Sequence, residues 1–206
     1  MTLIETLRRD ILAGTIPPGS LLMQTELAAR FGVSRIPVRD ALQALAAERL
    51  VTVVPGKGAR VIRLGPQELA EVYDLRILLE CDLIHRAARR TTEAQRYEAA
   101  HVLARSDLEA GRPGWEAGDR AFHLSLYAPA QRPRQIALVH ELRDTAALHL
   151  AQYQVLAENT SRWLDDHHQI FNAWQAGQAA SAAALLAAHL TAARDHLLQL
   201  VTAQTR

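Results

Sequence analysis

Hydrophobic positions at the start of the chain recur three and four residues apart, the spacing of an amphipathic helix. The apolar residues of this first helix are Leu3, Ile4, Leu7, Ile11 and Leu12. Gly14 and the run Pro17-Pro18-Gly19 follow. Because glycine and proline interrupt helices, we expect the helix to end before them.

Two shorter helices follow in the same pattern. Leu27, Ala28 and Phe31 give the first an apolar face, which Gly32 ends. Ser34 is a good N-cap for the second, whose inward face carries Val38, Leu42, Leu45 and Leu50. Arg35 and Arg39 then point outward on one side of its first turn. Arginines placed there can bridge the two acceptors of guanine or hold phosphate, so this pattern is typical of a DNA recognition helix.

Two short β-branched segments, 50–54 and 59–62, come next and predict a hairpin. Pro55-Gly56-Lys57-Gly58 joins them, with the only lysine of the chain at the tip. Glycine beside that lysine allows the backbone to approach a phosphate closely. An ordinary surface turn explains the same residues when they are taken alone.

The run GVSRIPVRDALQALAAERLV and the preceding PPGSLLMQTELAARF resemble the winged helix-turn-helix of the GntR family of bacterial transcription regulators. The resemblance covers roughly residues 2–63. It implies a set of DNA-contacting residues made up of Ser34, Arg35, Arg39, Lys57 and Gly58. In this set the arginines contact DNA, Ser34 supports them, and the wing brings Lys57 and Gly58 near the minor groove.

From Pro66 onward alanine and leucine dominate and there is almost no strand pattern. Glycine, proline and polar breaks divide this part into helices expected at 67–89, 92–110, 115–127, 132–158, 161–176 and 179–203. The chain is therefore mainly α, with a winged helix-turn-helix domain at 1–65 followed by an all-α bundle at 66–206. The bundle is large enough for its own core and an internal cavity.

Histidines carry the candidate chemistry of this bundle. Asp119 and His123 lie four residues apart on one helix, which suits two ligands of one metal. His167 falls in the middle of an apolar helical stripe, and His189 lies on the inward side of the last helix. Buried imidazoles need partners, and one aspartate with three histidines around a metal would satisfy them. Core histidines bonded to backbone or carboxylates are the alternative.

The bundle also resembles the FCD ligand-sensing domain of the FadR-type subfamily, through YDLRILLE at 73–80, DRAFH at 119–123, DHHQIFNAW at 166–174 and AAHL at 187–190. The resemblance implies that Asp119, His123, His167 and His189 coordinate a divalent metal, with an effector bound over it. Zn²⁺, Ni²⁺ and Mn²⁺ all suit such a ligand set.

A small carboxylate is the effector class expected for the metal-bearing members. Arg76 is a candidate second anchor for it, although an ion pair with Glu80 explains this arginine equally well. His196, seven residues beyond His189, is a further candidate for the same cavity. The expected mechanism is a homodimer that binds an inverted-repeat operator in double-stranded DNA and changes its affinity when the effector binds.

Charge separates the two predicted domains. Residues 1–65 carry nine Lys and Arg against five Asp and Glu, a balance of +4, and the remainder carries −3. A basic first domain suits a polyanionic partner. One cysteine, Cys81, excludes an internal disulfide, and no apolar run approaches the length of a membrane span. We therefore expect a cytoplasmic protein without a membrane partner.

Two other functions remain open at this point. Three histidines and an aspartate around an open metal can activate water, so a metal-dependent hydrolase is one alternative. No general base or nucleophile stands out near these residues, and we do not expect an enzyme. A regulator with a purely structural metal and an acyl-CoA effector is the other alternative.

Overall fold

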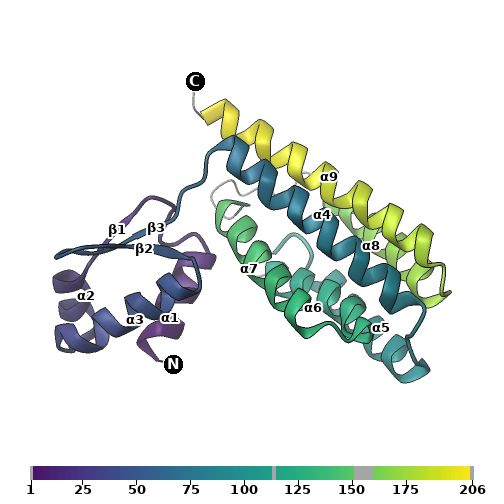
Figure 1. Ribbon diagram of the computed structural model, residues 1–206, viewed down its shortest axis with the longest axis horizontal. Coiled ribbons are helices and arrows are strands. Elements are labelled where there is room, and N and C mark those ends of the chain that lie inside the picture. Colours follow the sequence, from purple (N-terminus) through teal and green to yellow (C-terminus); the bar gives the residue numbers. More distant parts are fainter. Residues whose placement is uncertain (1, 113–114, 151–159, 205–206) are drawn as a thin grey trace. The chain divides into compact units, whose positions relative to one another are not determined.

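The computed structural model of the protein describes residues 2–112, 115–150 and 160–204 (Figure 1). The chain folds into two compact units. The first comprises Met1–Gly65 with Asp144–Tyr153, and the second comprises Pro66–Arg143 with Gln154–Arg206.

Three helices of the N-terminal unit, α1 (Leu3–Leu12), α2 (Gln24–Phe31) and α3 (Arg35–Ala47), occupy the stretches in which the hydrophobic pattern predicts them. A capping box starts α1: the Thr2 hydroxyl accepts from the Glu5 amide, and the Glu5 carboxylate accepts from the Thr2 amide at 2.8 Å. Gly32 ends α2 in the left-handed region, at φ 64°. The buried apolar faces of these helices share one core, which contains Leu7, Ile11, Leu27, Val38, Leu42 and Leu45.

A three-stranded antiparallel sheet completes this unit. The hairpin strands β2 (Val51–Val54) and β3 (Gly58–Val61) agree with the predicted wing. A further strand, β1 (Leu21–Met23), pairs with β3 to give the order β1-β3-β2, and it was not predicted. Three residues are too short to show the alternation by which a strand is found in a sequence.

The helices that follow are α4 (Pro66–Ala88), α5 (Glu93–Glu109), α6 (Trp115–Tyr127), the 3₁₀ turn η1 (Ala128–Ala130), α7 (Pro133–Leu150), α8 (Thr160–Gln175) and α9 (Ala179–Gln204). Their ends agree with the predicted helices to within one residue wherever both are described. Residues 151–158 of the helix predicted at 132–158 lie outside the described part of the chain.

The long helices α4 and α9 run side by side in the second unit (Figure 1). Side chains from each of the helices α4 to α9 fill the core of this unit, among them Leu83, Phe122, Trp174 and Leu186. Because α6, α8 and α9 all contribute to this core, polar residues on their inner faces meet in the interior. No helix in the described ranges is long and apolar enough to cross a membrane.

Candidate metal centre and DNA-binding surface

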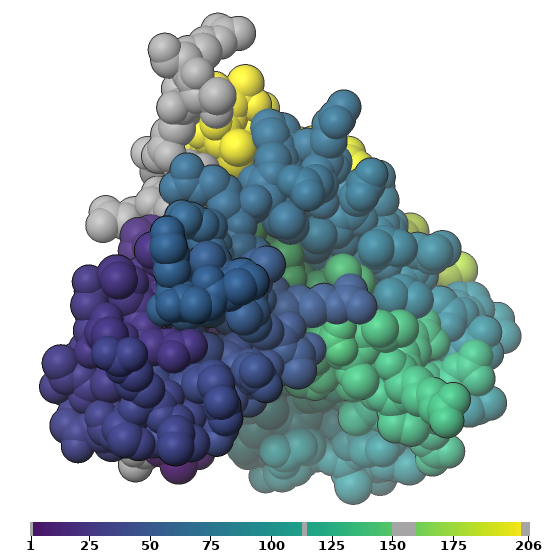
Figure 2. Space-filling view, turned by 60° about the vertical axis from the view of Figure 1, so that its left-hand side comes forward, coloured from purple at the N-terminus to yellow at the C-terminus, as the bar shows by residue number. Residues whose placement is uncertain are grey.

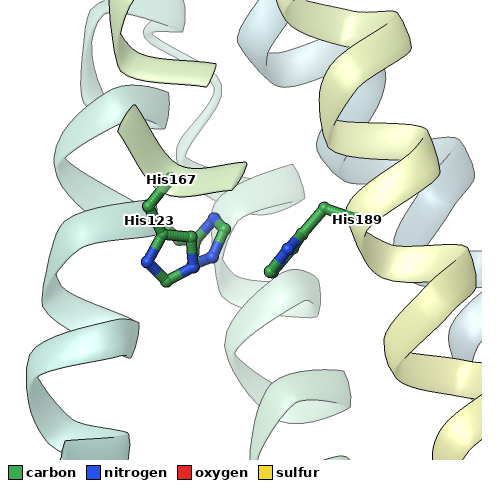
Figure 3. Close-up of side chains that lie close together, drawn as sticks. All are labelled: His123, His167 and His189. Atoms are coloured by element: carbon green, nitrogen blue, oxygen red, sulfur yellow. The ribbon is translucent and has the colours of Figure 1, made fainter. Parts of the chain in front are cut away.

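Three histidines converge inside the second unit (Figure 3). His123 comes from α6, His167 from α8 and His189 from α9. One ring nitrogen of each lies within 4.8 Å of the corresponding atoms of the other two. All three side chains are buried, with exposed fractions of 1%, 1% and 7%. The fold thus brings together three residues that the sequence separates by as much as 66 positions.

Asp119, the fourth predicted ligand, lies beside two of these rings. Its Oδ1 atom is 3.6 Å from Nε2 of His123 and 3.3 Å from Nε2 of His167. The helical spacing of Asp119 and His123 places both on the inner side of α6, as the sequence predicts. Oxygen and imidazole nitrogen together form a donor set that suits a divalent transition metal.

Hydrogen bonds orient two of the rings. Nδ1 of His189 lies 3.1 Å from Oδ2 of Asp166, and an ionised carboxylate can only accept. Nδ1 of His189 therefore carries the proton, which leaves Nε2 available as a ligand. Such a carboxylate behind a histidine is the usual support of a metal ligand. Asp166 was not predicted, although it is next to His167 in the sequence.

Tyr127 orients His123 in the same way. Its hydroxyl donates to the Glu80 carboxylate at 2.6 Å, so its oxygen can accept from Nδ1–H of His123, 3.4 Å away. Nε2 of His123 is then the atom with a free lone pair. In both histidines Nε2 is thus the ring nitrogen available to a metal.

His167 has no such partner. Neither of its ring nitrogens makes a hydrogen bond with any described residue, although both are buried. Burying an imidazole without partners is costly, and a bound metal would relieve the cost at one nitrogen. Nε2 of His167 lies 3.3 Å from the Asp119 carboxylate without forming a hydrogen bond, and Nδ1 forms none with a described residue either. This ring therefore argues against the alternative in which all three are satisfied core histidines, and the residues present fit a divalent metal.

Burial keeps His123 and His189 in the neutral form that binds metals. It lowers the pKa of His123 to about 3, and the nearby positive charge of Arg143 acts in the same direction. Burial also lowers the pKa of His189, against the opposing effect of its bond to Asp166.

A buried ionic network borders the centre. Glu80 accepts from Nε of Arg76 at 2.8 Å and from Nη2 of Arg143 at 2.6 Å. Burial favours the neutral form of Glu80, but the two arginines outweigh it and lower its pKa to about 2. Arg143 also reaches Oδ2 of Asp119 at 3.3 Å, so it links the network to the metal ligands.

Arg143 was not predicted as a site residue. Its signal in the sequence is its position between Val139 and Ala146, both buried, on the inward stripe of α7. A lone arginine on an apolar stripe needs a buried carboxylate, and nothing in the sequence identifies Glu80 as that carboxylate.

The predicted effector residues differ in their surroundings. Arg76 is buried, pairs with Glu80 as expected for a spacing of four, and stacks over the Tyr73 ring at 4.7 Å. The Tyr73 hydroxyl is buried without a hydrogen-bond partner among the described residues. His196 is half-buried, with its ring 6.5 Å from that of Trp163, and it is not part of the triad.

The predicted DNA-binding residues of α3 lie at its start. Ser34 is the N-cap residue by backbone geometry, but its side chain makes no capping bond. The expectation that Ser34 caps α3 is therefore met by its backbone alone. Arg35 and Arg39 are both exposed. Figure 2 shows an outer face of this unit in purple to blue.

Lys57 and Gly58, the two predicted DNA-contacting residues of the wing, have different surroundings. Lys57 is exposed at the hairpin tip, where its amide donates to the Val54 carbonyl at 3.1 Å. Gly58 is buried and pairs with Met23 of β1. A Cβ atom at Gly58 would overlap the carbonyl oxygen of Leu22, so the sheet itself requires glycine here.

Comparison with known proteins agrees with both halves of the chain. Residues 2–61 match the family described as "Bacterial regulatory proteins, gntR family", and residues 71–192 match the FCD domain. The chain belongs to the GntR family. It is a transcription regulator of the type that combines a GntR DNA-binding domain with an FCD domain.

Several GntR-type relatives span nearly all of the chain. The HTH-type transcriptional repressor GlaR of Escherichia coli (strain K12) is 31% identical over 89% of this chain and 89% of its own length. The HTH-type transcriptional regulator LutR of Bacillus subtilis (strain 168) is 30% identical, with coverages of 89% and 94%. A crystal structure of a putative transcriptional regulator GntR from Rhodococcus sp. RHA1 superposes with a TM-score of 0.80 at 27% identity, over 96% of each chain.

Proposed function

We propose that this GntR-type regulator is a metal-dependent repressor that senses a small carboxylate. In this proposal Asp119, His123, His167 and His189 hold one divalent ion. The effector binds over it and changes the affinity of a homodimer for an inverted-repeat operator. The observation that carries the proposal is the buried histidine triad, in which His167 has no hydrogen-bond partner among the described residues.

The donor set supports Zn²⁺, Ni²⁺ or Mn²⁺. Three neutral imidazoles and one carboxylate leave a divalent ion with a net positive charge, which attracts an anionic ligand. When bound, the ion would supply a Lewis-acidic contact for carboxylate oxygens. The protein residues hold it and fix the ligand tautomers through Asp166 and Tyr127.

Charge around the centre supports an acidic effector. Arg76 and Arg143 are matched by Glu80 and Asp119, so these four groups are neutral together. A divalent ion would add uncompensated positive charge to a buried region, and a carboxylate ligand would reduce it. The Tyr73 hydroxyl, which is buried and unpaired among the described residues, is available to a further polar atom of that ligand.

The first test combines metal analysis with a thermal-shift screen of small carboxylates, before and after chelation. We expect about one divalent ion per chain, and one acid that raises the unfolding temperature only in the metal-loaded protein. Saturation with that acid at 100 times its dissociation constant would stabilise the protein by about 2.7 kcal/mol.

His189→Ala should lower the metal content. His101→Ala, which changes an exposed histidine outside the triad, is the control. Full metal occupancy in His189→Ala would remove His189 from the ligand set.

The DNA-binding proposal has its own test. Arg35→Ala and Arg39→Ala should each weaken operator binding by about 1 to 3 kcal/mol while both units stay folded. Arg105→Ala changes another exposed arginine, on α5, and should leave binding unchanged. Undiminished binding by both α3 variants would contradict the assignment of α3 as the recognition helix.

Exposed leucines support the proposed homodimer. Leu75 and Leu78 on α4 are 48% and 68% exposed, and Leu138 on α7 is 50% exposed. Gln135 of α7 donates to the Leu79 carbonyl at 2.9 Å, so the two helices are neighbours at this point. Leu78→Glu should shift the protein toward monomer in analytical ultracentrifugation. A dimer of unchanged affinity would place the subunit contact elsewhere.

A further inference from the structure

Ile36 is an exposed apolar residue at the start of the recognition helix. Its side chain is 64% exposed, although most large apolar side chains of this unit are buried or partly buried. Arg35 precedes it, and Arg39 follows one turn later. Nothing in the core of the unit explains an isoleucine at this position.

The helical angle of Ile36 relative to the core indicates where it points. Successive residues are turned by about 100° around a helix axis. On this scale the buried residues Val38, Ala41, Leu42 and Leu45 surround one direction, and Ile36 lies almost opposite to it. Arg39 and the exposed Gln43 lie within about 60° of Ile36 on the same outward side. The exposed Asp40 also lies there, and its Oδ1 accepts from Arg39 at 3.4 Å. Ile36 is therefore at the centre of the outward face of α3.

Two features of this face identify its occupant. Cationic Arg35 and Arg39 complement DNA phosphate and guanine, and the N-terminal residues of a recognition helix meet base edges. The apolar group that B-DNA exposes in the major groove is the C5-methyl of thymine. We propose that Ile36 contacts the C5-methyl group of a thymine. It would thereby determine which base pair the regulator prefers next to the one that Arg35 contacts. The proposal rests on the DNA-binding function proposed above.

The test removes only the C5-methyl group of a thymine in the operator DNA. The full-length protein first selects its preferred duplex from a random library, and each thymine of one half-site is then replaced singly by deoxyuridine. At one position the replacement should weaken wild-type binding about fourfold, which corresponds to about 0.8 kcal/mol for one buried methyl or methylene. Ile36→Ala should bind the thymine duplex more weakly and lose less than about twofold on the same replacement.

Leu108→Ala is the matched control, because Leu108 is an equally apolar and 74% exposed residue on α5. It should show the wild-type ratio between thymine and deoxyuridine. Thymines that can all be replaced without loss, or an Ile36→Ala variant with the full wild-type ratio, would overturn the proposal. A change of oligomeric state in Ile36→Ala would instead assign this face to a protein contact. Failure to select any sequence would contradict the DNA-binding function together with this inference.

Discussion

The two units of the chain use charged residues in opposite ways. The N-terminal unit keeps Arg35, Arg39 and Lys57 on its surface around an apolar core, and its one buried carboxylate among residues 2–65, Asp10, pairs with exposed arginines. The second unit buries Glu80, Arg76, Arg143 and three histidines. Exposed charges are free to meet a polyanion, whereas buried charges depend on each other. Substitutions in the two units should therefore have different consequences: loss of binding in the first and loss of stability in the second.

Removing Arg143 should have the largest effect. Arg143→Met leaves Glu80 buried with one cation fewer, so we expect a loss of about 3 to 5 kcal/mol in unfolding free energy. Arg194→Met is the control, because Arg194 pairs at 2.9 Å with Asp74, whose side chain is 63% exposed. That variant should lose less than about 1 kcal/mol. Urea unfolding measures both, and equal losses would contradict the difference between buried and exposed pairs.

Acid should unfold the second unit of the metal-free protein first. The pKa of His123 falls from 6.5 to about 3 on folding, so between these values the unfolded chain binds a proton that the folded chain does not. Its stability therefore decreases as pH falls from about 6.5 toward 3. Glu80, with a pKa lowered from 4.5 to about 2, adds a loss between those values.

Tryptophan fluorescence can follow this transition selectively. All three tryptophans, Trp115, Trp163 and Trp174, lie in the second unit, and residues 1–65 contain neither tryptophan nor histidine. Fluorescence should report loss of structure at a higher pH than a probe of the N-terminal unit in the same full-length protein, such as amide hydrogen exchange of α1 and α3. A second unit that keeps its native fluorescence at pH 4 would contradict the expected linkage.

The sequence predicted which segments form helices, and which residues face inward, more reliably than it predicted which side chains contact one another. The positions of α3, the wing hairpin and the helices after Pro66 followed from apolar spacing and from glycine and proline breaks. The inward positions of His167 and His189 followed from the same spacing. Asp166, Tyr127 and Arg143 did not, because their roles depend on contacts across 23 to 63 positions that only the packed bundle creates. Strand β1 was not predicted because its three residues form a strand only by pairing with β3.

The support of His189 by Asp166 should have an intermediate effect. Asp166→Ala removes the carboxylate that fixes the His189 tautomer, and we expect metal affinity to fall about 10- to 100-fold. Asp107→Ala is a close control, because Asp107 has the same 26% side-chain exposure and pairs at 3.0 Å with the exposed His168. Competition with a chromogenic chelator measures both affinities. Equal losses would show that Asp166 has no special relation to the metal.

The smallest expected difference concerns two helix N-caps. Thr92 begins α5 with a full capping box, in which its hydroxyl accepts from the Gln95 amide at 3.3 Å. Thr92→Ala should lower the unfolding free energy by about 1 kcal/mol. Ser34 makes no side-chain capping bond, so Ser34→Ala should cost only about a few tenths of that.

The two substitutions should rank in the opposite order in their effect on operator affinity. The exposed Ser34 hydroxyl is free to contact DNA, so Ser34→Ala should weaken operator binding more than Thr92→Ala does. Urea unfolding followed by circular dichroism gives the stabilities, and operator titration gives the affinities. If Ser34→Ala instead destabilised the protein as much as Thr92→Ala and left binding unchanged, Ser34 would be a structural cap. The assignment of its side chain to the DNA-binding surface would then be wrong.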